Sequence, residues 1–194
     1  MPFVQGRPAM KFKKIEKQHT GKFIHRYDIT YETEKGQEKV YEMISRDSQI
    51  DSLERLQKRE ADAVVMVIHD MTGEKLLLNR EFRLALGDWV YNFPAGLIEP
   101  GEMIEESAKR ELKEETGLDL IAIDDIMGFS YSAVGFSNES NVCLVGRASG
   151  QFAGSNSDVE EIEAAWFTKK EIQELLKTGT FAARTQAYCY LWSR

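Results

Sequence analysis

The chain has 194 residues, 42% hydrophobic and 29% charged, and this composition is typical of a folded globular protein rather than a disordered or fibrous one. Its formal net charge of −7 argues against nonspecific nucleic-acid binding, because phosphate backbones attract clustered lysine and arginine. The longest apolar run, at 63–68, is too short to cross a bilayer, and the N-terminus lacks an apolar signal-peptide core. Cys143 and Cys189 form no metal-binding or disulfide pattern, which suggests a reducing compartment. Together, these observations predict a cytoplasmic protein that binds neither membranes nor nucleic acid.

The first predicted elements are two strands that form a hairpin. Residues 22–33 and 39–45 are rich in β-branched and aromatic side chains, and the turn-forming sequence EKGQ separates them. The polar stretch 48–60 fits either a short helix or a linker. The sequence therefore predicts a small N-terminal β extension, 1–58, followed by a second domain, 59–194.

The second domain is predicted to mix strands with a few helices, without the regular alternation of a parallel sheet. The expected strands are 61–70, 75–83, 88–99 with a break at Pro94, 119–128, 140–147 and 164–167. The expected helices are 102–116, 168–176 and 181–192. This pattern is typical of an α+β layered fold.

The first helix of this domain carries acids in unfavourable places. At about 100° per residue, Ile104, Ala108 and Leu112 form an apolar stripe, and Glu111 and Glu115 fall in the same sector. These two like charges stand four residues apart, near the negative end of the helix dipole. The unfavourable electrostatic energy of these carboxylates must therefore be offset by a positive charge or by solvent.

Two interpretations of the acids follow. A divalent cation would compensate Glu111, Glu114 and Glu115, and a donor set made only of oxygen favours Mg²⁺, or alternatively Mn²⁺. Alternatively, the acids form a solvated helix end with Arg110 and Lys113 as surface partners.

The same stretch resembles the signature of the Nudix hydrolase family. Gly96 is followed after five residues by Glu102, and after seven more by Arg110-Glu111-Leu112-x-Glu114-Glu115-x-Gly117-Leu118. The match covers the whole Nudix box, and a weaker resemblance extends from about residue 39 to the C-terminus. The resemblance implies a Nudix fold, in which a mixed β-sheet is sandwiched between helices. It also implies hydrolysis of a nucleoside diphosphate linked to another moiety.

The resemblance assigns roles within the box. Glu111, Glu114 and Glu115 become catalytic metal ligands, with Glu111 and Glu115 the strongest candidates. The backbone carbonyl of Ala95 would join them, and Gly96 would line the substrate site. Arg110 and Glu102 would hold the motif together by a charge-assisted contact.

Around the box, the chain resembles the ADP-ribose pyrophosphatase branch, whose members cleave ADP-ribose and other nucleoside diphosphate sugars. The sequences at 93–102 and 80–83 carry this resemblance, and so does the N-terminal hairpin. In that branch the extension is exchanged between two subunits and helps to form the nucleotide site, which implies a homodimer. Arg46 and Arg83 would contact substrate, although Arg83 also fits a surface arginine.

Two loops carry further candidates by the same resemblance. In the first, Glu139 would approach the substrate and Phe136 would stack on a base or sugar, with core packing as the alternative for Phe136. In the second, Glu160 would supply another ligand or the general base, with Asp158 and Glu161 as substitutes. A mobile polar connection is the alternative for that second loop.

The sequence leaves the substrate open. ADP-ribose enzymes usually carry a proline after the box, whereas here the corresponding stretch reads SAVG. GDP-mannose, UDP-glucose and other nucleotide sugars are therefore alternative substrates. The leading prediction is a Mg²⁺-dependent nucleotide-sugar pyrophosphatase. The alternatives are a Nudix hydrolase of nucleoside triphosphates, dinucleotides or coenzyme A, and a noncatalytic module that senses ADP-ribose.

Overall fold

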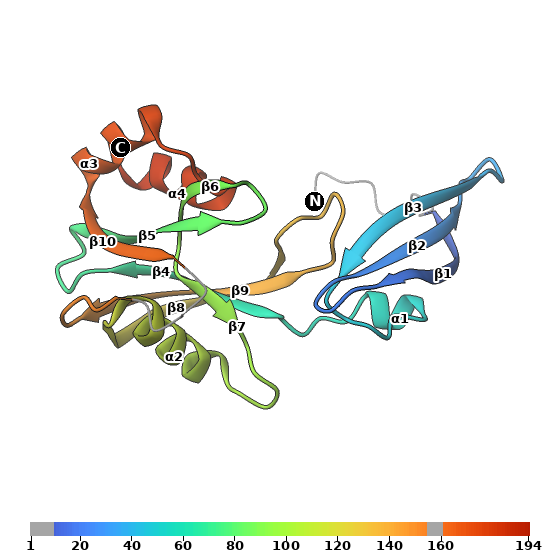
Figure 1. The fold of residues 1–194 in the computed structure, drawn as a ribbon, viewed down its shortest axis with the longest axis horizontal. Helices are drawn as coiled ribbons and strands as arrows, with labels where there is room; N and C mark the ends of the chain where they lie inside the picture. Colours follow the sequence, from blue (N-terminus) through green and yellow to red (C-terminus); the bar gives the residue numbers. More distant parts are fainter. Residues whose placement is uncertain (1–9, 155–160) are drawn as a thin grey trace, which may run out of the picture. The chain divides into compact units, whose positions relative to one another are not determined.

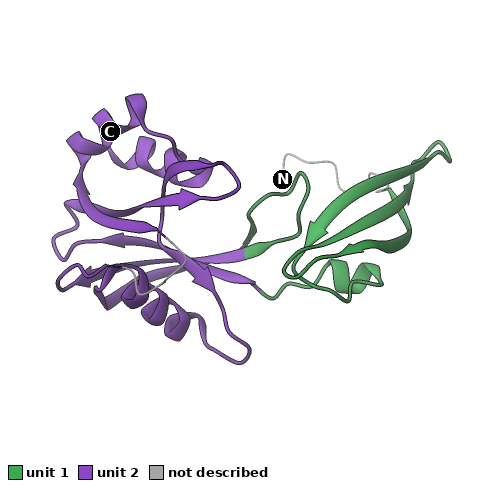
Figure 2. Cartoon of the chain, viewed as in Figure 1, with its two compact units in different colours: residues 1–60, 130–140 green, residues 61–129, 141–194 purple. Residues whose placement is uncertain are grey.

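The chain forms two compact units in a computed structural model that describes residues 10–154 and 161–194. The first unit comprises residues up to 60 together with 130–140, and the second comprises 61–129 and 141–194 (Figure 2). Every helix among the described residues is too short or too polar to cross a membrane.

The first unit is a three-stranded antiparallel sheet with a single helical turn (Figure 1). Its elements are β1 (Lys11–Thr20), β2 (His25–Glu32), β3 (Glu38–Ser45) and α1 (Leu53–Leu56). The predicted hairpin is present as β2 and β3. The edge strand β1 was not predicted, because its sequence KFKKIEKQHT is largely polar and exposed. Only Phe12 and Ile15 of β1 pack against the core of this unit.

The second unit is built on a mixed seven-stranded sheet. Its strands are β4 (Ala63–His69), β5 (Lys75–Arg83), β6 (Asp88–Asn92), β7 (Ala95–Leu97), β8 (Asp119–Tyr131), β9 (Ser140–Ser149) and β10 (Ile162–Thr168). The main order is β10-β5-β4-β9-β8, with β6 beside β5 and β7 beside β4. Strands β4 and β9 are parallel, whereas β5 runs antiparallel to β4 and β10, which makes the sheet mixed.

Helices cover both faces of this sheet (Figure 1). They are α2 (Ile104–Thr116) on one face, and α3 (Lys169–Thr178) and α4 (Ala183–Trp192) on the other. Strand β4 shows why the sheet is sandwiched. Val64, Met66 and Ile68 pack in the cluster that includes α2, and Val65 and Val67 pack in the cluster that includes α3 and α4. Because neighbouring side chains on a strand point to opposite faces, its apolar run is buried on both sides.

The segment that leads into α2 is attached to the centre of the sheet. Pro94 separates β6 from β7, as the sequence predicted, and its carbonyl accepts a hydrogen bond of 2.8 Å from the backbone N–H of Met66. Strand β7 then pairs with β4, so that Ala95 lies opposite Val65 and Gly96 opposite Val64. The start of the Nudix-like stretch is thereby fixed against the most buried strand.

Candidate active site

The end of α2 is set by a glycine in a left-handed conformation. Gly117 has φ +79, and its N–H donates to the carbonyl of Lys113 at 2.9 Å. A residue with a side chain rarely adopts this conformation, so the glycine ends the helix here, as its sequence predicted. The last two helical turns therefore present Glu111, Glu114 and Glu115 at a defined place.

Arg110 ties the turn before α2 to the helix itself. Its guanidinium binds both carboxylate oxygens of Glu102 at 2.9 Å and donates to the carbonyl of Leu97 at 3.1 Å. It also donates to Oε1 of Glu111 at 2.7 Å. The hydrogen bonds from Arg110 lower the pKa of Glu102 to about 2. The expected brace between Arg110 and Glu102 is thus present, and it also reaches one of the candidate catalytic acids.

Glu102→Gln should remove an acid-sensitive part of the protein's stability. The folded-state pKa of about 2 lies below the ordinary value of 4.5, so the ionised carboxylate stabilises the fold. This contribution is complete above pH 4.5 and disappears as the pH falls toward 2. The difference in thermal midpoint between wild type and Glu102→Gln should narrow as the pH is lowered from about 6 to about 2.5. A difference that stayed constant over this range would contradict the brace.

Glu111 lies directly over the backbone of Gly96. A Cβ atom built on Gly96 would stand 1.8 Å from Cδ of Glu111 and 2.2 Å from both of its carboxylate oxygens. Only a residue without a side chain permits this approach. Burial raises the pKa of Glu111, although the Arg110 guanidinium acts in the opposite direction. The structure therefore holds this partly buried carboxylate against β7.

Glu115 is buried, with only 9% of its surface exposed. Its Oε2 accepts a hydrogen bond of 2.8 Å from Nδ2 of Asn79, on β5. Burial raises the pKa of Glu115 to about 8, and the carboxylates of Glu111 and Glu81 act in the same direction. The backbone of Ala95 also hydrogen-bonds Glu115. The helical pattern predicted such a carboxylate on the apolar face of α2, whose negative charge a nearby positive charge would have to offset.

Glu114 differs from the other two acids of the helix end. Its side chain is 52% exposed, and its carboxylate lies 3.6 Å from Arg110. The solvated-end interpretation therefore describes Glu114 but not Glu111 or Glu115. Its role as a metal ligand stays a prediction.

The donor set of this site fits a hard divalent cation. Glu115 is buried and Glu111 is partly buried, both have raised pKa values, and each lies beside the Ala95–Gly96 backbone of β7. Carboxylate and carbonyl oxygens are the ligands that Mg²⁺ and Mn²⁺ prefer. In the described ranges 10–154 and 161–194, no three His, Cys, Asp or Glu side chains stand close enough together to hold a metal ion, and Glu111 is paired with Arg110 instead.

The metal-free protein should lose stability as the pH rises, through Glu115. A carboxyl whose folded-state pKa is raised binds its proton more tightly when folded, so stability falls as the pH rises from 4.5 toward about 8. Mg²⁺ should offset this loss, adding about 2.7 kcal/mol at about 100 times its Kd. Thermal midpoints in EDTA and in Mg²⁺ between about pH 5 and about pH 8 measure both effects. If the thermal midpoint of Glu115→Gln in EDTA fell with pH as steeply as that of wild type, another titrating group would be the cause.

Two residues near these acids were missed by the sequence-based prediction. Asn79 contacts Glu115, and Glu81 lies close enough to raise its pKa. Glu81 is itself held by Nδ2 of Asn92 at 2.9 Å. Asn79 could have been noticed in the sequence, because it is a polar residue directly after three leucines in a strand that is buried on both faces.

Arg83 ends β5 and pairs with a carboxylate of the same strand. Its guanidinium lies 3.5 Å from Glu81, and its side chain is 58% exposed. Both the substrate contact and the surface alternative are compatible with this position. Its assigned role stays a prediction.

The first unit brings three of the other candidates together. Arg46 forms an ion pair of 3.0 Å with Glu139, and the carbonyl of Phe136 accepts a hydrogen bond of 2.8 Å from Ile44. The side chain of Phe136 is 57% exposed, so the core-packing alternative is wrong for it. These residues belong to the first unit and the helix acids to the second, and their roles toward substrate stay predictions.

The second loop is only partly described. Glu160 and Asp158 lie outside the described residues. Glu161 has an exposed side chain, and its backbone carbonyl accepts a hydrogen bond of 3.0 Å from Phe82 of β5. The loop therefore returns to the sheet beside β5.

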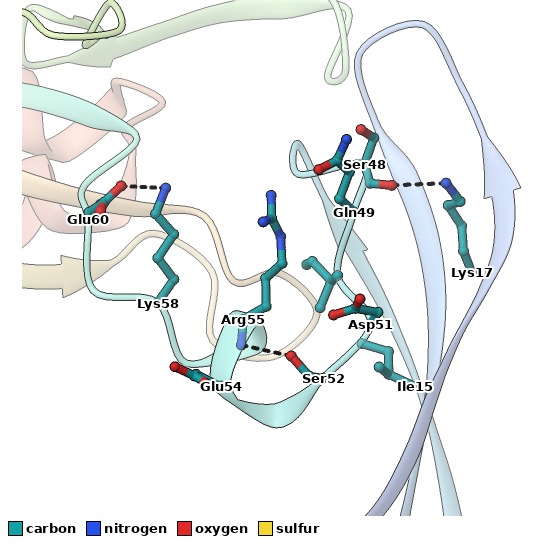
Figure 3. A pocket seen from close by; sticks show the side chains of 11 residues that line it. Ile15, Lys17, Ser48, Gln49, Asp51, Ser52, Glu54, Arg55, Lys58 and Glu60 are labelled. Atoms are coloured by element: carbon teal, nitrogen blue, oxygen red, sulfur yellow. Dashed lines mark hydrogen bonds and ion pairs between the residues drawn. The ribbon is translucent and has the colours of Figure 1, made fainter.

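An open pocket of about 930 Å³ lies in the first unit, between β1 and the segment around α1 (Figure 3). Its basic side chains already have partners: Lys17 donates to a backbone carbonyl at 2.9 Å, Arg55 binds Asp47 at 2.9 Å, and Lys58 pairs with Glu60 at 2.5 Å. With its cations compensated, the pocket offers little to an anionic phosphate. We do not assign the reaction to it.

The mixed sheet between helices and the braced acidic helix define a Nudix-type protein. A model of the NUDIX domain matches residues 59–188, and the chain belongs to the Nudix hydrolase family.

Individual relatives agree with this assignment. The chain is 32% identical over 139 residues to "Nudix hydrolase 19, chloroplastic" of Arabidopsis thaliana, which covers 69% of this chain and 31% of that protein. It is 33% identical over 100 residues to "ADP-sugar pyrophosphatase" of Mus musculus, covering 50% of this chain and 43% of that protein. These matches span less than half the length of either relative. A solved structure titled "Crystal structure of ADP compounds hydrolase" shares the fold, with a TM-score of 0.73, 19% identity, and coverage of 96% of this chain and 94% of that one.

Proposed function

We propose that this protein is a Mg²⁺-dependent pyrophosphatase of nucleoside diphosphate sugars, with ADP-ribose among the candidate substrates. The products would be a nucleoside monophosphate and a sugar phosphate. The observation that carries the proposal is a pair of acids removed from the surface, the buried Glu115 beside Asn79 and the partly buried Glu111 over Gly96. Similarity to an ADP-sugar pyrophosphatase supports the substrate class.

The residues of the site suit hydrolysis of a phosphoanhydride. Glu111 and Glu115, with Glu114 and the carbonyl of Ala95, would hold the cation. When bound, Mg²⁺ would neutralise phosphate oxygens and acidify water. Arg110 keeps Glu111 in place, and burial of Glu115 shields its carboxylate from bulk water.

The chemical step requires one further group. The oxygen of water attacks one phosphorus of the anhydride, the bridging P–O bond breaks, and the second phosphate leaves with the bridging oxygen. A carboxylate must accept the proton that the water loses. We assign this role to Glu160, with Asp158 or Glu161 as the substitute.

We further propose that the protein acts in the cytoplasm as a homodimer in which the N-terminal extension takes part. The extension has a core of its own around Tyr27, yet it leaves Phe23 65% exposed and Val40 58% exposed. These side chains would be covered if the extension forms the contact between the two subunits. Light scattering coupled to gel filtration would give twice the monomer mass, and a monomer would contradict the proposal.

A substrate panel tests the proposed activity. Nucleotide sugars, dinucleotides, nucleoside triphosphates and coenzyme A are incubated with Mg²⁺ or EDTA, and the products are resolved by chromatography. The expected result is metal-dependent release of a nucleoside monophosphate and a sugar phosphate from a nucleotide sugar. Preference for another class of nucleotide would overturn the substrate assignment. Tight binding of ADP-ribose in Mg²⁺ without turnover would indicate a sensor module instead.

A further inference from the structure

Asn79 interrupts the buried part of β5. Leu76, Leu77 and Leu78 are fully buried, and Asn79, which follows them, is 1% exposed. An amide in such a place lowers stability unless both of its ends are hydrogen-bonded. A leucine or valine would satisfy the local packing of a strand buried on both faces.

The amide of Asn79 is satisfied at one end only. Nδ2 donates to Oε2 of Glu115 at 2.8 Å, whereas Oδ1 is buried and has no hydrogen-bond partner among the described residues. The contact with Glu115 is therefore the contact that orients this amide. Its placement serves the carboxylate rather than the strand.

Asn92 provides a contrast within the same pair of strands. It stands directly opposite Asn79 in the β5–β6 register. Its Oδ1 accepts hydrogen bonds from the N–H of Phe93 at 2.9 Å and from Oγ1 of Thr185 at 3.0 Å, and its Nδ2 donates to Glu81 at 2.9 Å. Both ends of Asn92 are used, as expected of an asparagine that stabilises the fold.

We propose that Asn79 is a positioning residue of the reaction centre: its Nδ2 fixes the carboxylate of Glu115 so that the remaining lone pairs of that carboxylate are free to bind a divalent cation. The proposal rests on the proposed function, because it assumes that Glu115 is a ligand. The backbone of Ala95 provides a second contact. Glu115 is then held between β5 and β7 before any ion arrives, and its rotation need not be restricted on binding.

The test is the binding of Mn²⁺ to the full chain, measured by the electron paramagnetic resonance signal of the free ion. Asn79→Leu should weaken Mn²⁺ binding about 10–100-fold, as is usual for a residue that orients a metal ligand. Its thermal midpoint in EDTA should stay near that of wild type, because removal of an incompletely bonded amide offsets the loss of its hydrogen bond to Glu115. Asn79→Val, which suits a strand, is the second variant should the leucine fail to fit.

Two controls separate a positioning role from a structural one. Asn92→Leu should lower the thermal midpoint and leave the Mn²⁺ affinity near that of wild type. In the Glu115→Gln background, Asn79→Leu should cause no further loss of kcat/KM, because both changes act on the same carboxylate.

Three results would overturn the inference. The first is that wild type binds Mn²⁺ and that Asn79→Leu and Asn79→Val bind it equally tightly. Another is an equal loss of affinity in Asn92→Leu. The third is no Mn²⁺ binding by wild type at all, which would overturn the proposed function as well.

Discussion

Glu115→Gln is expected to lower kcat/KM by at least about 100-fold, since loss of even an outer-shell partner of a metal ligand costs about 10–100-fold. Glutamine keeps the shape of the side chain but removes the charge that would bind the cation. Glu115 is 9% exposed and has a pKa raised to about 8, so removal of this buried acid should leave the metal-free fold as stable as wild type or more so. Steady-state kinetics with the best substrate and thermal midpoints in EDTA measure the two effects.

The matched control is Glu105→Gln, which removes a carboxylate from the first turn of the same helix. It should retain kcat/KM within a few-fold of wild type. Full turnover by Glu115→Gln would show that this carboxylate is not part of the reaction, and the assigned mechanism would then be wrong.

Gly96→Ala is expected to lower kcat/KM by about 100-fold, because a displacement of about 1 Å at a reacting group can have an effect of this size. The new methyl group would lie 1.8 Å from Cδ of Glu111, so the carboxylate must move. The backbone has little room to retreat, since Gly96 is paired with Val64 of the central strand β4. Kinetics and the Mn²⁺ affinity should both reveal the displacement.

Gly128→Ala is the control for this change. Gly128 lies on β8, and a Cβ atom there would meet nothing within 4 Å. The same chemical substitution should therefore leave both activity and Mn²⁺ affinity unchanged. Equal losses in the two variants would mean that the approach of Glu111 to Gly96 has no special role.

The α+β fold with its mixed sheet between helices was predictable, because its signals are local and periodic. The apolar run at 63–68 gave the central strand, and its burial on both faces required helices on both sides. Pro94 separated β6 from β7, and Gly117 ended α2. Each of these residues restricts the backbone in a way that depends little on distant parts of the chain.

Strand β1 was missed because strand pairing, rather than side-chain pattern, creates it. Its many lysines are typical of a solvent-exposed segment, and the strand forms because its backbone pairs with β2. An edge strand rich in lysine is a common way to keep a sheet from pairing with other chains. A hydrophobic pattern therefore cannot reveal such a strand.

The candidate site was predictable only in part. The face on which Glu111 and Glu115 lie followed from helical geometry. The contact of Glu111 with Gly96 and that of Glu115 with Asn79 join residues from different elements, so spacing along the chain cannot give them. The roles proposed for Arg46, Arg83, Glu139 and Glu160 depend on a bound substrate and stay predictions.

The pairing of β7 with β4 has a consequence for the motions of this protein. Ala95 and Gly96 are joined to Val65 and Val64, which are almost fully buried. Local openings that expose backbone amides to exchange with solvent are rare in such central strands and approach the free energy of global unfolding. The backbone at Ala95 and Gly96, on which Glu111 lies, should therefore be among the last parts of the chain to open. Adaptation to substrates of different size must come from segments that are not paired with β4.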